Sequence, residues 1–280
     1  ISPATVKGSG LEDLFSTYPK RTFDVGIAEG HALTLASGLA VAGTHPIVSI
    51  YSTFMQRAFD QIIHDIARMN LSITFLVDRS GLVGLDGETH QGIYDESFLL
   101  STPNTVVTMP SSDKEAKYLL NESLKQHGPF FIRYPRDLLK KNHLIQEENH
   151  QFGKWIMECV ANSKRVAVIA VGQLLRSLKE LIIEADLDVT LVNALFLKPH
   201  DQEMLSSLSE YETIVIYDAY ATEFGFASYL KTKLCEMSYK GQIKSFAIPD
   251  VFVTQAKISE QLEELGLLPK QVFEEIKKLL

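Results

Sequence analysis

The sequence has little of what marks a disulfide scaffold or a membrane protein. Its 280 residues contain two cysteines, Cys159 and Cys235, which are too few for a disulfide framework and lack metal-ligand spacing. We therefore expect both thiols to be buried and inert in a reducing compartment, which favours the cytoplasm. The longest apolar run, around 166–171, is far shorter than the roughly 18–20 residues of a membrane helix, so no membrane partner is expected.

Basic residues are also fewer than acidic ones, with 27 Lys and Arg against 35 Asp and Glu. The net charge is −8, and no stretch clusters Lys and Arg with aromatic residues. Because binding to nucleic acids and anionic membranes depends on neutralising phosphates, both are poor partners for this chain. A small phosphorylated molecule remains compatible, since two or three local cations are enough to bind it.

The start of the chain shows neither a methionine nor a targeting leader. Residues 1–3 have the pattern of a strand end that enters a loop. We therefore expect upstream residues that this sequence does not contain.

Apolar strand patterns alternate with helical patterns along most of the chain. In the first half, we expect strands at 22–25, 46–51, 72–77, 105–109 and 130–134, and helices at 29–41, 56–69 and 113–126. In the second half, we expect strands at 166–171, 189–193, 213–217 and 243–248, and helices at 174–185, 202–208, 227–237 and 269–280.

This alternation predicts two α/β domains, each with a parallel sheet covered by helices. The first domain is expected at residues 1–137 and the second at 152–280. The polar, unperiodic residues 138–151 between them predict a linker.

Residues 80–92 form the least regular stretch, with four glycines in 13 residues (Gly81, Gly84, Gly87 and Gly92). Long irregular loops in compact domains are often functional, which makes this loop a candidate.

Glu29 opens an apolar helical pattern and has no basic residue nearby in the sequence. A carboxylate at a helix N-terminus commonly just complements the helix dipole, and the pattern by itself favours that interpretation. A buried carboxyl group with a catalytic role is the alternative.

Five blocks of residues, taken together, carry a family resemblance. They are Phe23–Glu29, Tyr51–Gln61, Asp78–Gly81, Gly84–Gly92 and Arg133–Arg136. In order and spacing they closely resemble the 1-deoxy-D-xylulose-5-phosphate synthases, transketolase-like enzymes that use thiamine diphosphate. The resemblance is strong over residues 1–137, as a pyrimidine-binding domain. It is looser over 165–280, as a transketolase-type C-terminal domain.

The resemblance implies a cofactor pocket around Glu29. This carboxyl group would hydrogen-bond the pyrimidine nitrogen N1′ of thiamine diphosphate and favour the tautomer that removes the thiazolium proton. Phe54 would stack on the pyrimidine, and Tyr51 would line the same pocket. Without the resemblance, packing at a strand end would be the favoured role for both rings.

The resemblance also implies substrate contacts. Asp86 and His90 would contact the intermediate derived from the substrate, although both could simply hydrogen-bond within their loop. Arg79 and Arg136 would hold the phosphate of glyceraldehyde 3-phosphate, a task that suits the bidentate and permanently charged guanidinium group. Pairing with carboxylates is the ordinary alternative for these two arginines.

Two further arginines, Arg57 and Arg133, are weaker candidates for the same phosphate region.

Three features depart from the family pattern. Gly30 follows Glu29 where the family has glutamine, and residues 221–227 contain only Gly225 where relatives have a glycine-rich turn. The Gly-Asp-Gly segment that anchors Mg²⁺ and the diphosphate is absent. Those groups would therefore be held by residues outside this chain, in an upstream domain or on a partner chain.

The expected reaction joins pyruvate to glyceraldehyde 3-phosphate, giving 1-deoxy-D-xylulose 5-phosphate and CO₂ for isoprenoid and thiamine biosynthesis. The resemblance also implies a homodimer. Two alternatives stay open: the C-terminal subunit of a split transketolase, and a catalytically silent assembly scaffold.

Overall fold

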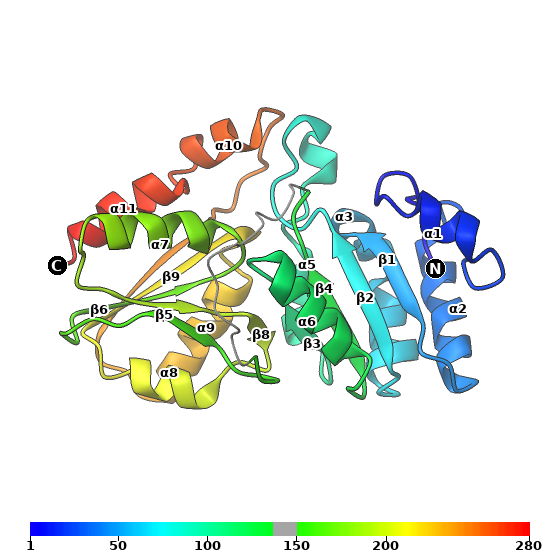
Figure 1. The fold of residues 1–280 in the computed structure, drawn as a ribbon, viewed down its shortest axis with the longest axis horizontal. Coiled ribbons are helices and arrows are strands. Elements are labelled where there is room, and N and C mark those ends of the chain that lie inside the picture. Colours follow the sequence, from blue (N-terminus) through cyan, green and yellow to red (C-terminus); the bar gives the residue numbers. More distant parts are fainter. Residues whose placement is uncertain (137–149) are drawn as a thin grey trace.

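The computed structural model describes residues 1–136 and 150–280, which form two α/β units lying side by side (Figure 1). The expected linker at 138–151 lies outside the described residues except for its last two positions.

The first unit begins with helices and ends with strand β4. Its elements are α1 (Glu12–Thr17), α2 (Glu29–Val41), β1 (Ile47–Tyr51), α3 (Ser52–Met55), α4 (Phe59–Gln61), β2 (Ile73–Asp78), α5 (Asp95–Ser101), β3 (Val106–Thr108), α6 (Asp113–Ser123) and β4 (Pro129–Arg133). Short 3₁₀ turns occur at Gln56–Ala58, Gly84–Asp86 and Glu88–His90, and a π-helical turn at Ile62–Ala67.

The second unit continues the alternation. Its elements are β5 (Ile156–Cys159), β6 (Val166–Ala170), α7 (Leu174–Glu184), β7 (Thr190–Asn193), β8 (Phe196–Lys198), α8 (Gln202–Leu208), β9 (Thr213–Thr222), α9 (Phe226–Glu236), β10 (Gln242–Ile248), α10 (Ile258–Glu264) and α11 (Pro269–Lys277).

Each unit contains one mainly parallel sheet, as the alternation predicted. The strand orders are β1-β2-β4-β3-β8 and β10-β9-β6-β7-β5. One edge strand in each sheet is antiparallel: β8 pairs with β3, and β5 pairs with β7. Strand β8 follows β7 in the chain yet joins the first sheet, so the two units are interlocked through a shared strand.

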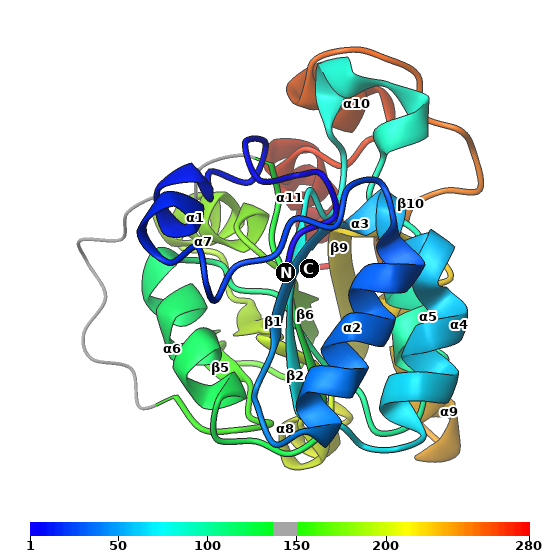
Figure 2. The same cartoon turned by 90° about the vertical axis from the view of Figure 1, so that its right-hand side faces the viewer.

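Helices cover both faces of each sheet. In the first unit, α2 and α5 lie on one side of the sheet and α6 on the other (Figure 2). In the second unit, alternate residues of β6 face opposite layers. Val168 packs in one core cluster with residues of α7 and α11, whereas Ile169 packs in another with residues of α8 and α9. Successive side chains of β6 point to opposite faces of the sheet, and both faces are buried. The strand is therefore an uninterrupted apolar run in the sequence.

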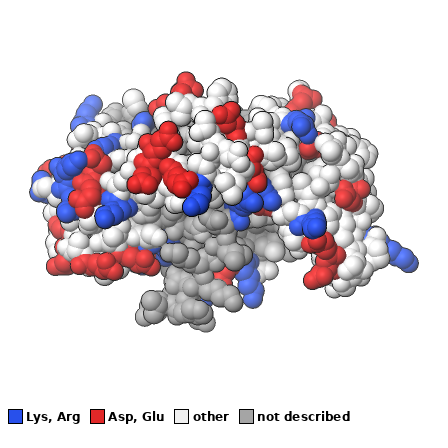
Figure 3. Space-filling model, turned by 90° about the horizontal axis from the view of Figure 1, so that it is seen from above, with Lys and Arg blue, Asp and Glu red and all other residues white. Residues whose placement is uncertain are grey.

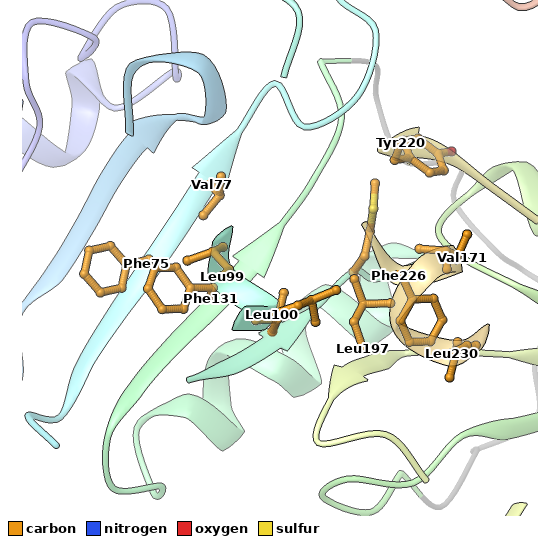
Figure 4. Packing of buried hydrophobic residues seen from close by; sticks show 14 of the residues in the cluster. Phe75, Val77, Leu99, Leu100, Phe131, Val171, Leu197, Tyr220, Phe226 and Leu230 are labelled. Carbon is orange, nitrogen blue, oxygen red and sulfur yellow. The ribbon is translucent and has the colours of Figure 1, made fainter. Parts of the chain in front are cut away.

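One hydrophobic core runs through both units. Figure 4 shows Phe75 and Phe131 of the first sheet in the same cluster as Leu197, Phe226 and Leu230 of the second unit. The rings of Phe75 and Phe131 stack with centroids 4.4 Å apart. The relative position of the units is therefore fixed by apolar packing as well as by the shared strand.

Several local expectations were wrong. The helix expected at 56–69 starts at Ser52 instead and is broken into α3, a 3₁₀ turn, α4 and a π-helical turn. The strand expected at 22–25 is reduced to a single bridge between Asp24 and Ser2. Strand β9 continues to Thr222, five residues beyond the expected end, because all of its residues are buried.

The expectation of two buried cysteines was also wrong. Cys235 is exposed and Cys159 is half-buried, and both are free thiols. Burial raises the pKa of Cys159, so this thiol is less reactive than an exposed one.

Within the described ranges, no helix has the length and apolar character needed to cross a membrane. Figure 3 looks down on the face at which the strands of the first sheet end. Acidic and basic side chains are interspersed there, with no broad basic region among the coloured atoms.

Candidate functional site

Glu29 is the first residue of α2, and it is only 3% exposed. Its Oε1 atom accepts a hydrogen bond from Nη1 of Arg57 at 3.0 Å. The fold thus supplies the basic partner that is missing from the local sequence. Among the described residues the Glu29 side chain forms no other hydrogen bond, so Oε2 remains available for a ligand.

Two aromatic rings lie beside this ion pair. Tyr51 ends β1, and Phe54 belongs to α3, which follows immediately. The two rings stack with centroids 5.5 Å apart, and His90 meets Phe54 edge-on at the same separation. The guanidinium carbon of Arg57 lies 5.3 Å from the Phe54 centroid, which connects the rings to Glu29.

Two arginines converge on one carboxylate. Asp86 lies 2.9 Å from Nη1 of Arg136 and 3.8 Å from Nε of Arg79. Arg79 also donates to Asp78 at 2.9 Å, and its guanidinium carbon lies 3.8 Å from the Tyr51 ring centroid. The two positive charges are therefore balanced by two carboxylates.

One donor in this arrangement has no partner. Nε of Arg79 is buried and forms no hydrogen bond with the described residues, because its distance to Asp86 is too long. A buried guanidinium donor without an acceptor is costly, and an oxygen atom of a bound anion would satisfy it.

The loop at 80–92 depends on its glycines for this geometry. Gly81 and Gly92 pair as an antiparallel bridge at its base. A Cβ atom at Gly92 would lie 1.9 Å from the Arg79 carbonyl oxygen and 2.8 Å from the Cβ of Ser52. Glycine is required here so that the loop can approach the start of α3 and bring His90 to the Phe54 ring.

The site lies where parallel strands end, which is the usual position of ligand sites in α/β sheets. The side chains come from the carboxyl ends of β1, β2 and β4 and from the N-terminus of α2. The structure brings together, in one continuous set of contacts, all of the residues expected from the sequence: Glu29, Tyr51, Phe54, Arg79, Asp86, His90 and Arg136.

A cavity of about 570 Å³ is lined by one of these residues, Arg136. Val83, Leu85 and Arg136 line it from the first unit, and Gln173, Tyr220 and Ile258 are among the residues that line it from the second. The sequence pattern did not predict these contributions, because they depend on how the two units pack.

Arg133 is not available to a substrate, contrary to the weaker expectation from the sequence. It is fully buried and pairs with Asp95 at 2.8 Å and with Glu96. Its Nη2 atom also donates to the Tyr220 carbonyl oxygen of the second unit at 3.0 Å. Removing such an arginine from its partners would leave buried charges uncompensated, so its role is structural.

Asp95 connects this buried cluster to the site, because it accepts a hydrogen bond from Ser52 at the start of α3 at 2.8 Å. Nothing in the sequence singled out Asp95 or Ser52.

The residues present fit part of a thiamine cofactor. A buried carboxyl group beside an aromatic ring suits an aminopyrimidine, which needs a hydrogen-bond partner and a stacking surface. No cluster of His, Cys, Asp and Glu side chains that could hold a metal ion occurs in residues 1–136 or 150–280.

Comparison with protein families gives two matches. Residues 1–141 match the pyrimidine-binding domain of transketolase, and residues 154–272 match the transketolase C-terminal domain.

Similar curated proteins are 1-deoxy-D-xylulose-5-phosphate synthases. Those of Exiguobacterium sibiricum and Clostridium botulinum (strain Eklund 17B) are 39% and 40% identical to this chain, over 99% and 100% of its length. The chain spans less than half of these relatives, 44% and 45% of their respective lengths.

Two solved structures with a similar fold are transketolases. A split-gene transketolase, described as an inactive β4 tetramer, superposes with a TM-score of 0.81 at 22% identity and covers 98% of this chain and 88% of its own. Transketolase from Campylobacter jejuni superposes with a TM-score of 0.77 at 16% identity and covers 99% of this chain and 43% of its own. The chain therefore belongs to the transketolase family, with the pyrimidine-binding and C-terminal domains of that family and a sequence similar to 1-deoxy-D-xylulose-5-phosphate synthases.

Proposed function

We propose that this chain forms part of an enzyme that decarboxylates pyruvate and joins the remaining two-carbon unit to D-glyceraldehyde 3-phosphate. The bond between C1 and C2 of pyruvate breaks, CO₂ leaves, a bond forms to the aldehyde carbon, and one proton is taken up. The product is 1-deoxy-D-xylulose 5-phosphate. The observation that carries this proposal is the placement of Glu29, the Phe54 ring and the Arg79–Asp86–Arg136 group in one site.

Glu29 acts on the pyrimidine of thiamine diphosphate. When bound, this cofactor supplies the nucleophilic carbon and the electron sink for decarboxylation. The carboxyl group of Glu29 shares a proton with the pyrimidine nitrogen through Oε2, while Arg57 holds Oε1. Phe54 provides the stacking surface, and Tyr51 supports that ring from its other side.

Arg79 and Arg136 bind the phosphate of the aldehyde substrate. The unpartnered Nε of Arg79 supports this role, since a phosphate oxygen would satisfy it. Asp86 must then give up part of its contact with the arginines, which leaves its carboxylate free to orient hydroxyl groups of the substrate. His90, whose Nδ1 lies 2.9 Å from Thr89 Oγ1, exchanges a proton with the bound substrate in this proposal.

The remaining parts of the enzyme lie outside this chain in our proposal. Another domain, on the same polypeptide or on a partner chain, holds Mg²⁺ and the diphosphate. Residues 1–137 act as the pyrimidine-binding domain, 138–151 as a linker and 152–280 as the C-terminal domain of a cytoplasmic homodimer.

The test is the reaction of the complete enzyme with thiamine diphosphate and Mg²⁺. We expect CO₂ release from pyruvate in proportion to consumption of glyceraldehyde 3-phosphate. Transfer of two-carbon units from a ketose phosphate without CO₂ would assign the chain to a split transketolase instead. A complete protein that binds no thiamine diphosphate in a titration would leave only the scaffold role.

A further inference from the structure

The loop at 80–92 carries Asp86 and His90 but has little regular structure of its own. Two 3₁₀ turns and one bridge are its only local order. Figures 1 and 2 both show it lying beside the segment of the second unit that leads into α10. Contacts from outside the loop are therefore needed to hold Asp86 and His90 in place.

Gln91 makes the first connection. It is 2% exposed, and its Oε1 atom accepts a hydrogen bond from the Val83 amide at 2.9 Å, which closes the loop internally. Its Nε2 atom donates to the carbonyl oxygen of Val253 at 3.2 Å, which lies in the second unit between β10 and α10. One side chain thus fastens the loop both to itself and to the other unit.

Gln255 makes the second connection in the opposite direction. Its Nε2 atom donates to the carbonyl oxygen of Leu85 at 2.8 Å. The backbones approach closely at the same place, because a Cβ atom at Gly84 would lie 3.1 Å from Ile258 Cγ1 and 3.3 Å from the Ala256 carbonyl oxygen. The two glutamine amides attach at Leu85 and Gln91, immediately outside the stretch from Asp86 to His90.

We infer that Gln91 and Gln255 are positioning residues, through which the second unit holds Asp86 and His90 in the geometry required for the reaction. This inference rests on the proposed function for the roles of Asp86 and His90. The attachment of the loop to the second unit does not depend on the proposed function, because it consists of hydrogen bonds from the two side-chain amides to backbone carbonyl oxygens. These two hydrogen bonds also give the second unit a direct part in shaping the site.

Hydrogen–deuterium exchange of the loop amides in the full-length protein tests the fastening without any assay of activity. Gln255→Met keeps the length of the side chain but removes its donor, and Gln255 is exposed, so the fold should tolerate the change. Because one hydrogen bond changes an opening equilibrium by about twofold to about tenfold, exchange at residues 83–90 should rise by that factor. Gln255→Lys restores a donor of similar reach and should restore the protection.

Gln271→Met is the matched control. Gln271 donates to the Glu263 carbonyl oxygen at 2.9 Å, entirely within the second unit, so the same substitution there should leave the loop unchanged. Unchanged exchange in Gln255→Met, or an equal rise in Gln271→Met, would overturn the inference.

Catalysis supplies the second measurement. In the complete enzyme, Gln255→Met should lower kcat by about threefold to about tenfold, because misplacement of catalytic groups affects the reacting state. The KM for pyruvate should change less than twofold, and Gln255→Lys should recover kcat. A raised KM with unchanged kcat would contradict a positioning role. If the wild-type enzyme forms no product, the proposed function fails, whereas the exchange experiment still decides whether the amides hold the loop.

Discussion

Asp86 occupies the position that decides what the two arginines can bind. With Asp86 between them and Asp78 beside Arg79, the two arginines are already balanced by two carboxylates, and in the proposed function a phosphate must compete with Asp86. The arrangement favours a ligand that brings two negative charges and several acceptor oxygens over a singly charged one.

Arg136→Met should weaken binding of the phosphorylated substrate selectively. Because a hydrogen bond between charged groups contributes roughly 1.5–3 kcal/mol, the KM for glyceraldehyde 3-phosphate should rise by about tenfold or more. The KM for pyruvate should stay nearly constant. Steady-state kinetics with each substrate varied in turn provides the measurement. Arg68→Met is the control, since the only hydrogen bond of the Arg68 side chain among the described residues is to the His64 carbonyl oxygen. An equal rise in both KM values would argue against a phosphate role.

The proximity of the candidate residues was predictable where a motif contained them. Glu29, Phe54, His90 and Arg79 each lie inside a recognisable block, and the fold brings these blocks together. The role of Arg133 was not predictable in the same way, because its partners Asp95 and Glu96 lie 38 and 37 residues away and bury it completely.

At the scale of elements, the glycines of the site separate into two kinds. Gly92 is required by space, since a Cβ atom would collide with the Arg79 carbonyl oxygen. Gly30, which replaces the glutamine expected from the family, is not required by space. A Cβ atom there would make ordinary contact with Gln61 at 3.5 Å.

Alanine substitution at these two glycines should therefore have opposite effects. Gly30→Ala should raise the free energy of unfolding by about 0.5–1 kcal/mol, because alanine costs less backbone entropy in a helix. Gly92→Ala should lower it by at least about 1 kcal/mol, since the loop or α3 has to shift. Urea denaturation of both variants tests this pair of predictions. Destabilisation by Gly30→Ala would show that α2 needs glycine beside Glu29.

Most helices and central strands were predictable from the periodicity of apolar residues, because the positions of these residues reflect which side chains are buried. Helix α2 was predicted with its observed bounds. The breaks between α3 and the π-helical turn were not predictable, since they depend on packing against neighbours. Strands β5 and β8 are short edge strands of only 4 and 3 residues, which leave almost no pattern.

On the scale of the whole molecule, a buried acidic cluster lies where the two units meet. Glu96 accepts from Arg133 and from the Phe226 amide, the latter at 2.6 Å, and it interacts with Asp218 of β9. Burial, and next the nearby Asp218 carboxylate, raise the pKa of Glu96 well above its ordinary value. Oδ2 of Asp218 is buried and has no hydrogen-bond partner among the described residues, so a proton on Glu96 would supply it with a donor.

This cluster predicts a dependence of stability on pH. The unfolded chain releases the Glu96 proton near the ordinary pKa of 4.5, whereas the folded protein retains it to higher pH. The stabilisation is therefore complete below that value and is lost as pH rises from there through the raised pKa, because the folded protein still binds a proton that the unfolded chain has released.

The glutamine side chain in Glu96→Gln cannot ionise, so this variant should lack the pH-dependent part of the stability that Glu96 contributes. As pH rises above 4.5, the free energy of unfolding of the wild type should fall relative to that of Glu96→Gln. Urea titrations at several pH values measure the difference. Parallel curves for the two proteins would mean that Glu96 is already ionised in the folded state. Glu122→Gln is the control, because Glu122 pairs with Lys125 near the end of α6, away from the cluster.

The shared core and the transfer of β8 into the first sheet could not be read from the sequence. Both depend on contacts between segments far apart in the chain, such as Phe131 with Leu197 in one cluster. The division into two α/β units, by contrast, follows from the order of the elements.

The most direct measurement is turnover of the complete enzyme carrying Glu29→Gln, which keeps the size of the side chain but cannot share a proton as a carboxyl group does. We expect kcat to fall by about 10²-fold to about 10⁴-fold, while the denaturation midpoint stays close to that of the wild type. The matching substitution Glu12→Gln, in α1 and exposed, should leave turnover unchanged. Near-normal formation of product by Glu29→Gln would contradict a role for this carboxyl group in activating the cofactor.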